Sequence, residues 1–451
     1  MTVRRHHRSG RRLAALATTL ALVVSACGGD DEPAADSDPT EESEATGDEP
    51  ASDPAEATGT ADEPPADDGE QITLSYFTFS AAPDHLEDLD AIIAAFEAEN
   101  PNITIDTQTA AYDDYFTSLQ TQVAGGTAPD TFELNYENFV TYARSGALLD
   151  LGSAGIDGSR YYPLALEGFQ DDGTQYGLPA TFSDVVLIYN KTLFDDAGLD
   201  YPTADWTWDD YTTAAEALTD ADAGVYGGYQ PVSFFEFYKA LAQAGGEFFD
   251  ADGNATFNSE AGVAAAEWLT SKPDTIMPSL ADIGGTPDFD TNLFQSGNLA
   301  MWHNGIWQFS GLAESGVDYD IVVEPGMDQD ASAVFMNGVV ASADTNHPEE
   351  AAAWIEFLTA SETTVDTRLA SSWELPAVDD QAAFDEYLTI TPPENRQAVF
   401  DSLDNIALPP VIERQAEMQE IVGQALETIV IDGADIQSTL DDAAAEVDSL
   451  S

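Results

Sequence analysis

The sequence is poor in basic residues, in histidine and in cysteine. It has 13 Lys or Arg against 84 Asp or Glu, which gives a formal net charge of −71 at pH 7. So acidic a surface repels nucleic acid and anionic lipid, and neither is an expected partner. Beyond residue 26, the three histidines His85, His303 and His347 are isolated from one another and from the single cysteine, Cys27. No zinc-type spacing exists, so we expect neither a metal site nor a cofactor.

The sequence also lacks the motifs of common nucleotide-dependent and serine-dependent enzymes. It has no G-x-S-x-G nucleophile elbow and no G-x-x-x-x-G-K-[ST] phosphate loop. Residues 250–260 superficially resemble a calcium loop, but glycine comes fourth rather than sixth, so we expect a β-turn there. Acidic pairs are so numerous that they could imitate the two carboxylates of a glycoside hydrolase by chance. We predict that the protein is not an enzyme, and an anchored extracellular glycan hydrolase stays as an alternative.

The first 26 residues contain five arginines and no acidic residue. Their apolar stretch, 13–26, has fourteen residues, and at about 1.5 Å per residue it is too short to span a ~30 Å hydrocarbon core. This pattern predicts a secretory signal peptide. Residues 24–28 (VSACG) resemble the lipobox of bacterial lipoproteins, so Cys27 would carry the lipid that anchors an exported protein to the outer face of the cytoplasmic membrane. Arg11-Arg12 leaves twin-arginine export open, although general secretion is favoured.

The next segment, 28–70, has no Val, Ile, Leu, Met, Phe, Trp or Tyr, and it includes 17 acidic residues. Without apolar side chains it cannot bury a core, so residues 27–70 are predicted to form a disordered acidic stalk. As a flexible chain this segment would span on the order of 35 Å, and charge repulsion would lengthen it. It would hold a globular body away from the membrane.

From residue 71 the pattern becomes that of a globular α/β protein. Residues 72–79 and 103–105 read as strands, and apolar residues recur at helical spacing over 86–96 and 115–123. This β-α-β-α order predicts a mostly parallel sheet with helices on its faces. The body is too long for one small sheet, so two α/β lobes with a cleft between them are expected.

Several short motifs, in order and at matching spacing, resemble those of one family. The motifs are AGGTAPD at 124–130, YGLP at 176–179, YNKTLFDDAGL at 189–199, FQSGNLAM at 294–301 with GIW at 305–307, and PEEAAAWIEFL at 348–358. Together they resemble the family-1 extracellular solute-binding proteins of ABC importers, the class that includes maltose-binding protein. The resemblance extends from about residue 71 to the end of the chain.

The resemblance implies the type II periplasmic-binding-protein fold, with two α/β lobes, a hinge and an interlobe cleft. By that analogy residues 71–182 and 337–374 form one lobe, and residues 183–336 and 375–451 form the other. The implied function is to capture a mono- or oligosaccharide by interlobe closure and deliver it to the permease subunits. The implied protein is a lipid-anchored monomer.

A sugar presents C–H-rich faces and rims of hydroxyls, so its site needs aromatic platforms together with amides and carboxylates. The family pattern places such residues at the end of the first strand, after Pro129-Asp130, and at the crossing into the second lobe. It also places them ahead of Gly245-Gly246 and at Trp307 and Trp373. The expected ligand-binding residues are Phe79, Ser80, Asn135, Tyr136, Glu137, Phe182, Asp184, Ser233, Phe235, Glu236, Trp307 and Trp373.

The acidity leaves the class of ligand open. Only eight basic residues follow residue 26, so the Lys or Arg contacts of some sugar-binding relatives cannot be assigned here. A receptor for a polyamine, a peptide or another cationic solute is therefore an alternative. Because the acids are spread over the whole chain, a solvated surface of the halophile type is the favoured interpretation of the charge.

Overall fold

The computed structural model describes residues 70–156, 158–284, 286, 288–372 and 374–450, which belong to one compact unit, Asp67–Ser451. The predicted signal peptide, the lipidation site Cys27, the stalk and Trp373 lie outside the described residues. Among the residues that are described, no helix combines the length and the apolarity needed to cross a membrane.

The predicted β-α-β-α start is confirmed, and the rest of the chain continues to alternate. The strands are β1 Ile72–Thr78, β2 Ile103–Thr109, β3 Thr131–Asn135, β4 Gln170–Asp171, β5 Thr174–Gln175, β6 Gly177–Asn190, β7 Met301–Gly305, β8 Tyr319–Val322, β9 Ser332–Ala341, β10 Leu375–Pro376 and β11 Ile406–Ala407.

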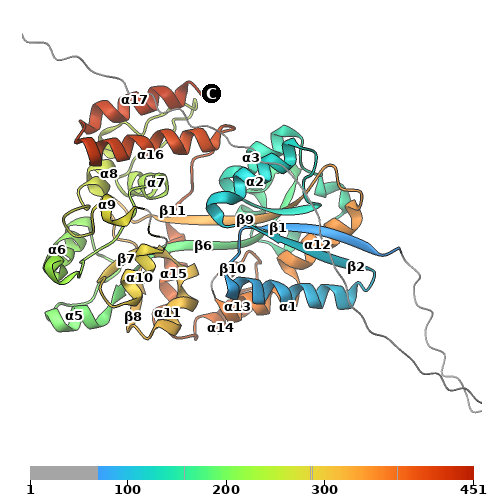
Figure 1. Cartoon of the computed structure of the whole chain (residues 1–451), viewed down its shortest axis with the longest axis horizontal. Helices are drawn as coiled ribbons and strands as arrows, with labels where there is room; N and C mark the ends of the chain where they lie inside the picture. The colour runs from blue at the N-terminus through green and yellow to red at the C-terminus, as the bar shows by residue number, and fades with distance from the viewer. Residues whose placement is uncertain (1–69, 157, 285, 287, 373, 451) are drawn as a thin grey trace, which may run out of the picture. The chain divides into compact units, whose positions relative to one another are not determined.

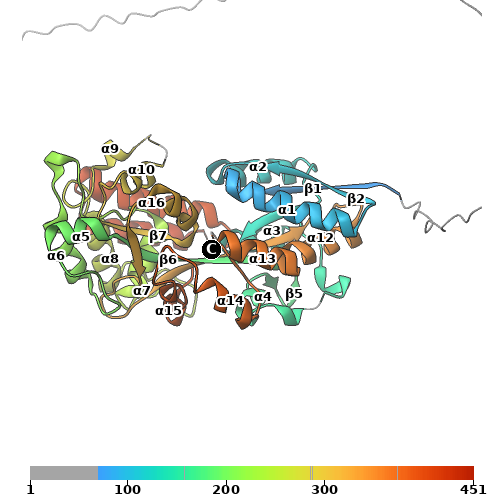
Figure 2. The same ribbon diagram turned by 90° about the horizontal axis from the view of Figure 1, so that it is seen from below.

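Helices cover the sheet on both sides (Figures 1 and 2). They are α1 Pro83–Glu99, α2 Tyr112–Ala124, α3 Tyr136–Ser145, α4 Pro163–Glu167, α5 Lys191–Ala197, α6 Trp208–Leu218, α7 Phe234–Gln243, α8 Glu260–Thr270, α9 Leu280–Ile283, α10 Phe289–Gln295, α11 Phe309–Ser315, α12 Pro348–Ala360, α13 Glu362–Ser371, α14 Gln381–Tyr387, α15 Gln397–Asp401, α16 Gln415–Asp432 and α17 Ile436–Asp448.

The main sheet has the order β10-β6-β9-β3-β1-β2, with β7 and β8 joining β6 and with β11 joining β9. Only the β1–β2, β1–β3 and β11–β9 pairs are parallel. The prediction of a mostly parallel sheet is therefore wrong, because β9 returns from far along the chain and pairs antiparallel with both β3 and β6.

Two long strands, β6 and β9, run side by side across the unit (Figure 1). All fourteen residues of β6 are buried. Its first half pairs with β9 as far as Asp184↔Val334, and its second half pairs with β7 from Val185↔Gly305 onward. One continuous strand therefore connects two regions of the structure, and the direction of its side chains is fixed by alternation along its length.

The buried apolar residues form two clusters. The first surrounds β1, β2, β3 and α12, and it contains Trp354 of α12, which is fully buried. It also includes Trp302 of β7. The second cluster gathers α6, α7, α8, α16 and α17. The expected lobe boundaries stay a prediction.

Half of the eight basic residues beyond residue 26 are used inside the protein. Lys239, Lys272, Arg368 and Arg396 are all buried. Arg396 donates from Nε to the carbonyl of Ile390 at 2.7 Å and lies over the ring of Tyr387. Few cations are left to neutralise the many surface carboxylates, which agrees with the acidic surface expected from composition.

Candidate functional site

A cavity of about 570 Å³ is enclosed by residues from elements far apart in the sequence. Its position follows from the alternation of side chains along β6 and β9, where Ser183 is the register partner of Phe335. Ser183 and Val185 of β6 line it together with Phe335 and Asn337 of β9. A volume of this size suits a small-molecule ligand.

The remaining residues reach the cavity from the ends of strands and from the starts of helices. Phe79 and Ser80 follow β1, Asn135 ends β3, and Glu137 lies in the first turn of α3. Two of the helices that contribute to the cavity, α3 and α7, begin at a capping side chain. Asn135 accepts from the backbone N–H of Asn138, and Ser233 accepts from that of Glu236, each at 3.3 Å.

The lining combines three types of side chain that suit a hydroxyl-rich ligand. We call this space the central cavity. Its aromatic residues are Phe79, Tyr112, Phe235, Trp307 and Phe335; its carboxylates are Glu137, Glu236 and Glu374; its amides are Asn135, Asn304 and Asn337; and its other members are Ser80, Ser183, Ser233, His85, His303, Val185 and Pro231. No described Lys or Arg lines it.

Eight of the twelve residues expected from the sequence line the central cavity. They are Phe79, Ser80, Asn135, Glu137, Ser233, Phe235, Glu236 and Trp307. Trp307 lies in a short 3₁₀ helix, Ile306–Gln308, directly after β7. Its ring meets that of Phe335 at 5.7 Å between centroids, and Phe235 meets Phe335 at 5.8 Å. These three rings form a continuous aromatic face.

Three other expected residues do not line the central cavity. Tyr136 is half-buried, and its ring lies close to Gly168, which is not part of the cavity lining. Phe182 is buried against Tyr162, with the ring centroids 6.4 Å apart. Asp184 is fully buried in β6. Phe182 and Asp184 point to the opposite face from their neighbours Ser183 and Val185 because side chains alternate along a strand. The fourth, Trp373, lies outside the described residues.

Ten lining residues are not among the twelve expected from the sequence: His85, Tyr112, Ser183, Val185, Pro231, His303, Asn304, Phe335, Asn337 and Glu374. Three of these could have been found from neighbours, because Ser183 follows Phe182, Asn304 precedes Gly305-Ile306-Trp307, and Glu374 follows Trp373. Phe335 and Asn337 carry no local signal, since their place depends on the pairing of β9 with β6.

Glu137 is a buried carboxylate, and only one of its two oxygens is hydrogen-bonded within the described part of the protein. Its Oε1 accepts from Asn135 Nδ2 at 2.7 Å, and its Oε2 has no hydrogen-bond partner among the described residues. Burial raises the pKa of Glu137 to about 7. An unpaired buried oxygen costs about 1–3 kcal/mol, so a ligand group that donates to it would be favoured.

Glu374 has protein partners on both oxygens. Asn337 Nδ2 donates to its Oε1 at 2.9 Å, and Arg368 lies 3.4 Å from its Oε2. Burial raises the pKa of Glu374. Behind it lies Glu133, whose pKa is raised to about 7 by burial and then by the charge of Glu374.

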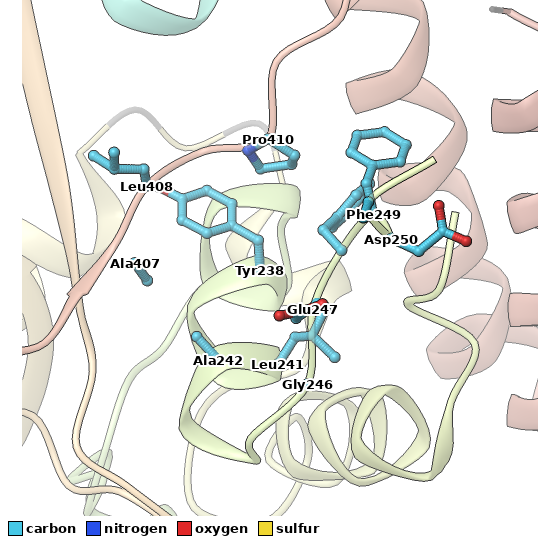
Figure 3. Close-up of a pocket in the computed structure, with 12 residues that line it drawn as sticks. Tyr238, Leu241, Ala242, Gly246, Glu247, Phe249, Asp250, Ala407, Leu408 and Pro410 are labelled. Carbon is cyan, nitrogen blue, oxygen red and sulfur yellow. The ribbon is translucent and has the colours of Figure 1, made fainter. Parts of the chain in front are cut away.

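A second cavity of about 490 Å³ shares no lining residue with the central cavity (Figure 3). Tyr238 and Leu241 of α7 face Leu408 and Pro410 across it. One of its carboxylates, Asp250, already accepts from Asn254 and from backbone N–H groups in a turn. The sequence predicts a β-turn in this segment, and the structure confirms the turn between the bridged residues Phe249 and Ala255. The second cavity is therefore the weaker candidate for a ligand site.

Comparison with known proteins identifies the family. Residues 91–392 match the profile of the bacterial extracellular solute-binding proteins. The chain belongs to this family. An ABC substrate-binding protein of Listeria monocytogenes, solved in complex with cycloalternan, is 40% identical, with a TM-score of 0.81 over 84% of this chain and 99% of that one.

Two further relatives agree with the assignment. The maltodextrin-binding protein MdxE of Bacillus subtilis is 24% identical over 65% of this chain and 70% of its own. The GacH receptor of Streptomyces glaucescens, solved without ligand and with acarbose, is 18% identical, with a TM-score of 0.74 over 85% of this chain and 99% of that one. The predicted two-lobed type II fold of this solute-binding protein is therefore confirmed, and the protein is an exported one.

Proposed function

We propose that this solute-binding protein captures an oligosaccharide in the central cavity and delivers it, chemically unchanged, to the permease of an ABC importer. The observation that carries the proposal is the lining itself. An aromatic face of Phe235, Trp307 and Phe335 lies beside three amides and three carboxylates. Aromatic rings pack on the C–H faces of sugars, and carboxylates and amides hydrogen-bond the hydroxyl rims.

The relatives support the same class of ligand. The Listeria protein was solved with cycloalternan, the Bacillus protein is named for maltodextrin, and the Streptomyces receptor was solved with acarbose. Because the Listeria protein shares 40% of its residues with this chain, cycloalternan is the first ligand to test.

Capture works by closure of the two predicted lobes, 71–182 with 337–374 and 183–336 with 375–451. The central cavity takes Phe79, Glu137 and Asn337 from the first and Phe235 and Trp307 from the second. A ligand that contacts both lobes favours the closed arrangement, and a permease that contacts both lobes distinguishes the loaded receptor from the free one. The receptor acts as a monomer that is held at the membrane through a lipid on Cys27 and the acidic stalk 27–70.

A cationic solute is a second candidate, favoured by one observation. The cavity has three carboxylates and, among its described residues, no lysine or arginine that would repel an ammonium group. A thermal-shift screen separates the two candidates. At a ligand concentration of 100 Kd, binding stabilises the folded state by about 2.7 kcal/mol, so a true ligand raises Tm clearly. We expect cycloalternan or maltotetraose to raise Tm and spermidine to leave it unchanged; the reverse result would replace the sugar with the cation.

A further inference from the structure

A group of buried charged residues lies directly behind the central cavity. The carboxylate of Glu324 is 2.7 Å from Lys239 Nζ and 2.8 Å from His303 Nδ1. Lys239 Nζ is also 2.7 Å from Glu236 Oε2, which accepts from Gln230 Nε2 at 2.6 Å. Glu324, Lys239, His303 and Glu236 are all buried, and two of them, Glu236 and His303, line the cavity.

These contacts determine which nitrogen of His303 carries the proton. Burial alone would raise the pKa of Glu324, but its contacts with His303 and Lys239 lower it to about 2. Glu324 is therefore ionised and can only accept, so Nδ1 of His303 must carry the hydrogen. Burial lowers the pKa of His303, although Glu324 opposes this effect. A neutral imidazole with hydrogen on Nδ1 has a free lone pair on Nε2.

That lone pair has no hydrogen-bond donor within the described part of the chain. His303 is 2% exposed, and leaving a buried acceptor unpaired destabilises the free protein. Nδ1 and Nε2 lie on opposite sides of the ring. With Nδ1 turned to Glu324, the group that pairs with Nε2 must come from the other side. One face of the ring packs against Tyr211, at 4.8 Å between centroids.

We propose that His303 determines ligand specificity by accepting a hydrogen bond at Nε2 from a hydroxyl of the bound oligosaccharide, and that Glu324 and Lys239 are positioning residues that hold His303 in this tautomer. The inference rests on the proposed function and deepens it. A site with an acceptor and no donor at this point requires a free hydroxyl on the ligand. A sugar whose corresponding hydroxyl is removed or methylated leaves Nε2 unpaired, so it binds more weakly.

Two substitutions test the proposal, because glutamine and asparagine imitate different nitrogens of histidine. His303→Gln places an amide oxygen near the position of Nε2 but loses the contact with Glu324. His303→Asn keeps a donor to Glu324 but places nothing at Nε2. By calorimetry with cycloalternan we expect His303→Asn to weaken binding about tenfold, the equivalent of about 1.4 kcal/mol, and His303→Gln to weaken it less than about threefold.

Equal losses in the two variants, or full affinity in His303→Asn, would overturn the proposal. Thermal unfolding of both ligand-free variants shows whether a loss reflects unfolding. If the wild type binds no sugar at all, the proposed function itself is wrong. If the wild type binds the sugar and His303→Asn binds it with the same affinity, only the role of His303 is wrong.

The positioning role has its own readout. In the wild type, ¹⁵N NMR of the ligand-free protein should show His303 protonated at Nδ1 and unprotonated at Nε2, with the Nε2 signal shifting when the sugar binds. In Glu324→Gln, which removes the obligatory acceptor, we expect a mixture of tautomers. A wild-type His303 protonated at Nε2, or a Glu324→Gln spectrum identical to that of the wild type, would contradict the assignment of roles.

Discussion

The indole ring of Trp307 meets the phenyl ring of Phe335 at an interplanar angle of 64° and a centroid distance of 5.7 Å. Edge-to-face pairs of this kind hold both rings in place, so the exposed face of Trp307 is oriented before any ligand arrives. Phe335 comes from the long strand β9, whose register with β6 is fixed by the sheet. The platform is therefore built on a rigid element rather than on a loop.

Replacing this platform should weaken binding more than it weakens the fold. Trp307→Ala removes a ring that is only partly buried, and we expect it to reduce affinity for the sugar at least about tenfold. Phe249→Ala is the matched control, since Phe249 is also a partly buried aromatic residue but lines the second cavity. Calorimetry should find that Phe249→Ala binds the sugar with the affinity of the wild type. Equal affinities of the two variants would remove Trp307 from the site.

Glu137 should make binding depend on pH. Its pKa is raised to about 7 by burial, so in the free protein it changes from neutral to ionised near neutrality. An ionised carboxylate accepts stronger hydrogen bonds from ligand hydroxyls than a neutral one does. We expect the affinity of the wild type to rise between pH 6 and pH 8, and that of Glu137→Gln to stay flat. A variant with the same pH profile as the wild type would assign the titration to another group.

Asp184 should lower stability as the pH rises. Both of its oxygens are buried, and burial holds its pKa well above the usual value. In the unfolded chain it loses its proton near pH 3.9, whereas in the folded protein it keeps the proton to higher pH. The unfolded state then binds fewer protons, so this group reduces stability above about pH 4.

Asp184→Asn removes the titration and keeps the shape. Urea unfolding of the two proteins should therefore give similar free energies at pH 4 and a growing advantage for the variant between pH 5 and pH 8. A wild type that is the more stable protein at pH 8 would show that Asp184 is ionised and paired.

The bound sugar should be released intact. The central cavity holds three carboxylates, and Glu137, with its pKa near 7, has the protonation behaviour of a general acid. In a binding protein these groups only form hydrogen bonds. Mass spectrometry after long incubation at equimolar ratio should recover unchanged oligosaccharide. Shortened products that disappear in Glu137→Gln would favour the glycan hydrolase instead.

The sequence motifs located the segments of the site better than they located individual residues. The family pattern places Phe182 and Asp184 at the crossing into the second lobe, and that segment does reach the central cavity, but through Ser183 rather than through Phe182 and Asp184. A shift of one residue along a strand reverses every side chain, and a single sequence carries no information on which face is turned to the cavity when both faces are buried. All residues of β6 are buried, so hydrophobic alternation gave no signal.

The fold shows the same division between local and long-range information. Periodicity predicted β1, α1, β2 and α2, because each depends on neighbouring residues. It could not predict that β9, some 200 residues after β3, returns antiparallel beside it. Asn337 enters the site only through that pairing.

Calorimetric titration of the wild type with cycloalternan, followed by the same titration with spermidine, tests the central claim most directly. We expect saturable 1:1 binding of cycloalternan, weakened at least about tenfold in Trp307→Ala, and no binding of spermidine. Binding of spermidine alone would contradict the account, because it would show that the carboxylates of the central cavity serve a cation rather than the hydroxyls of a sugar.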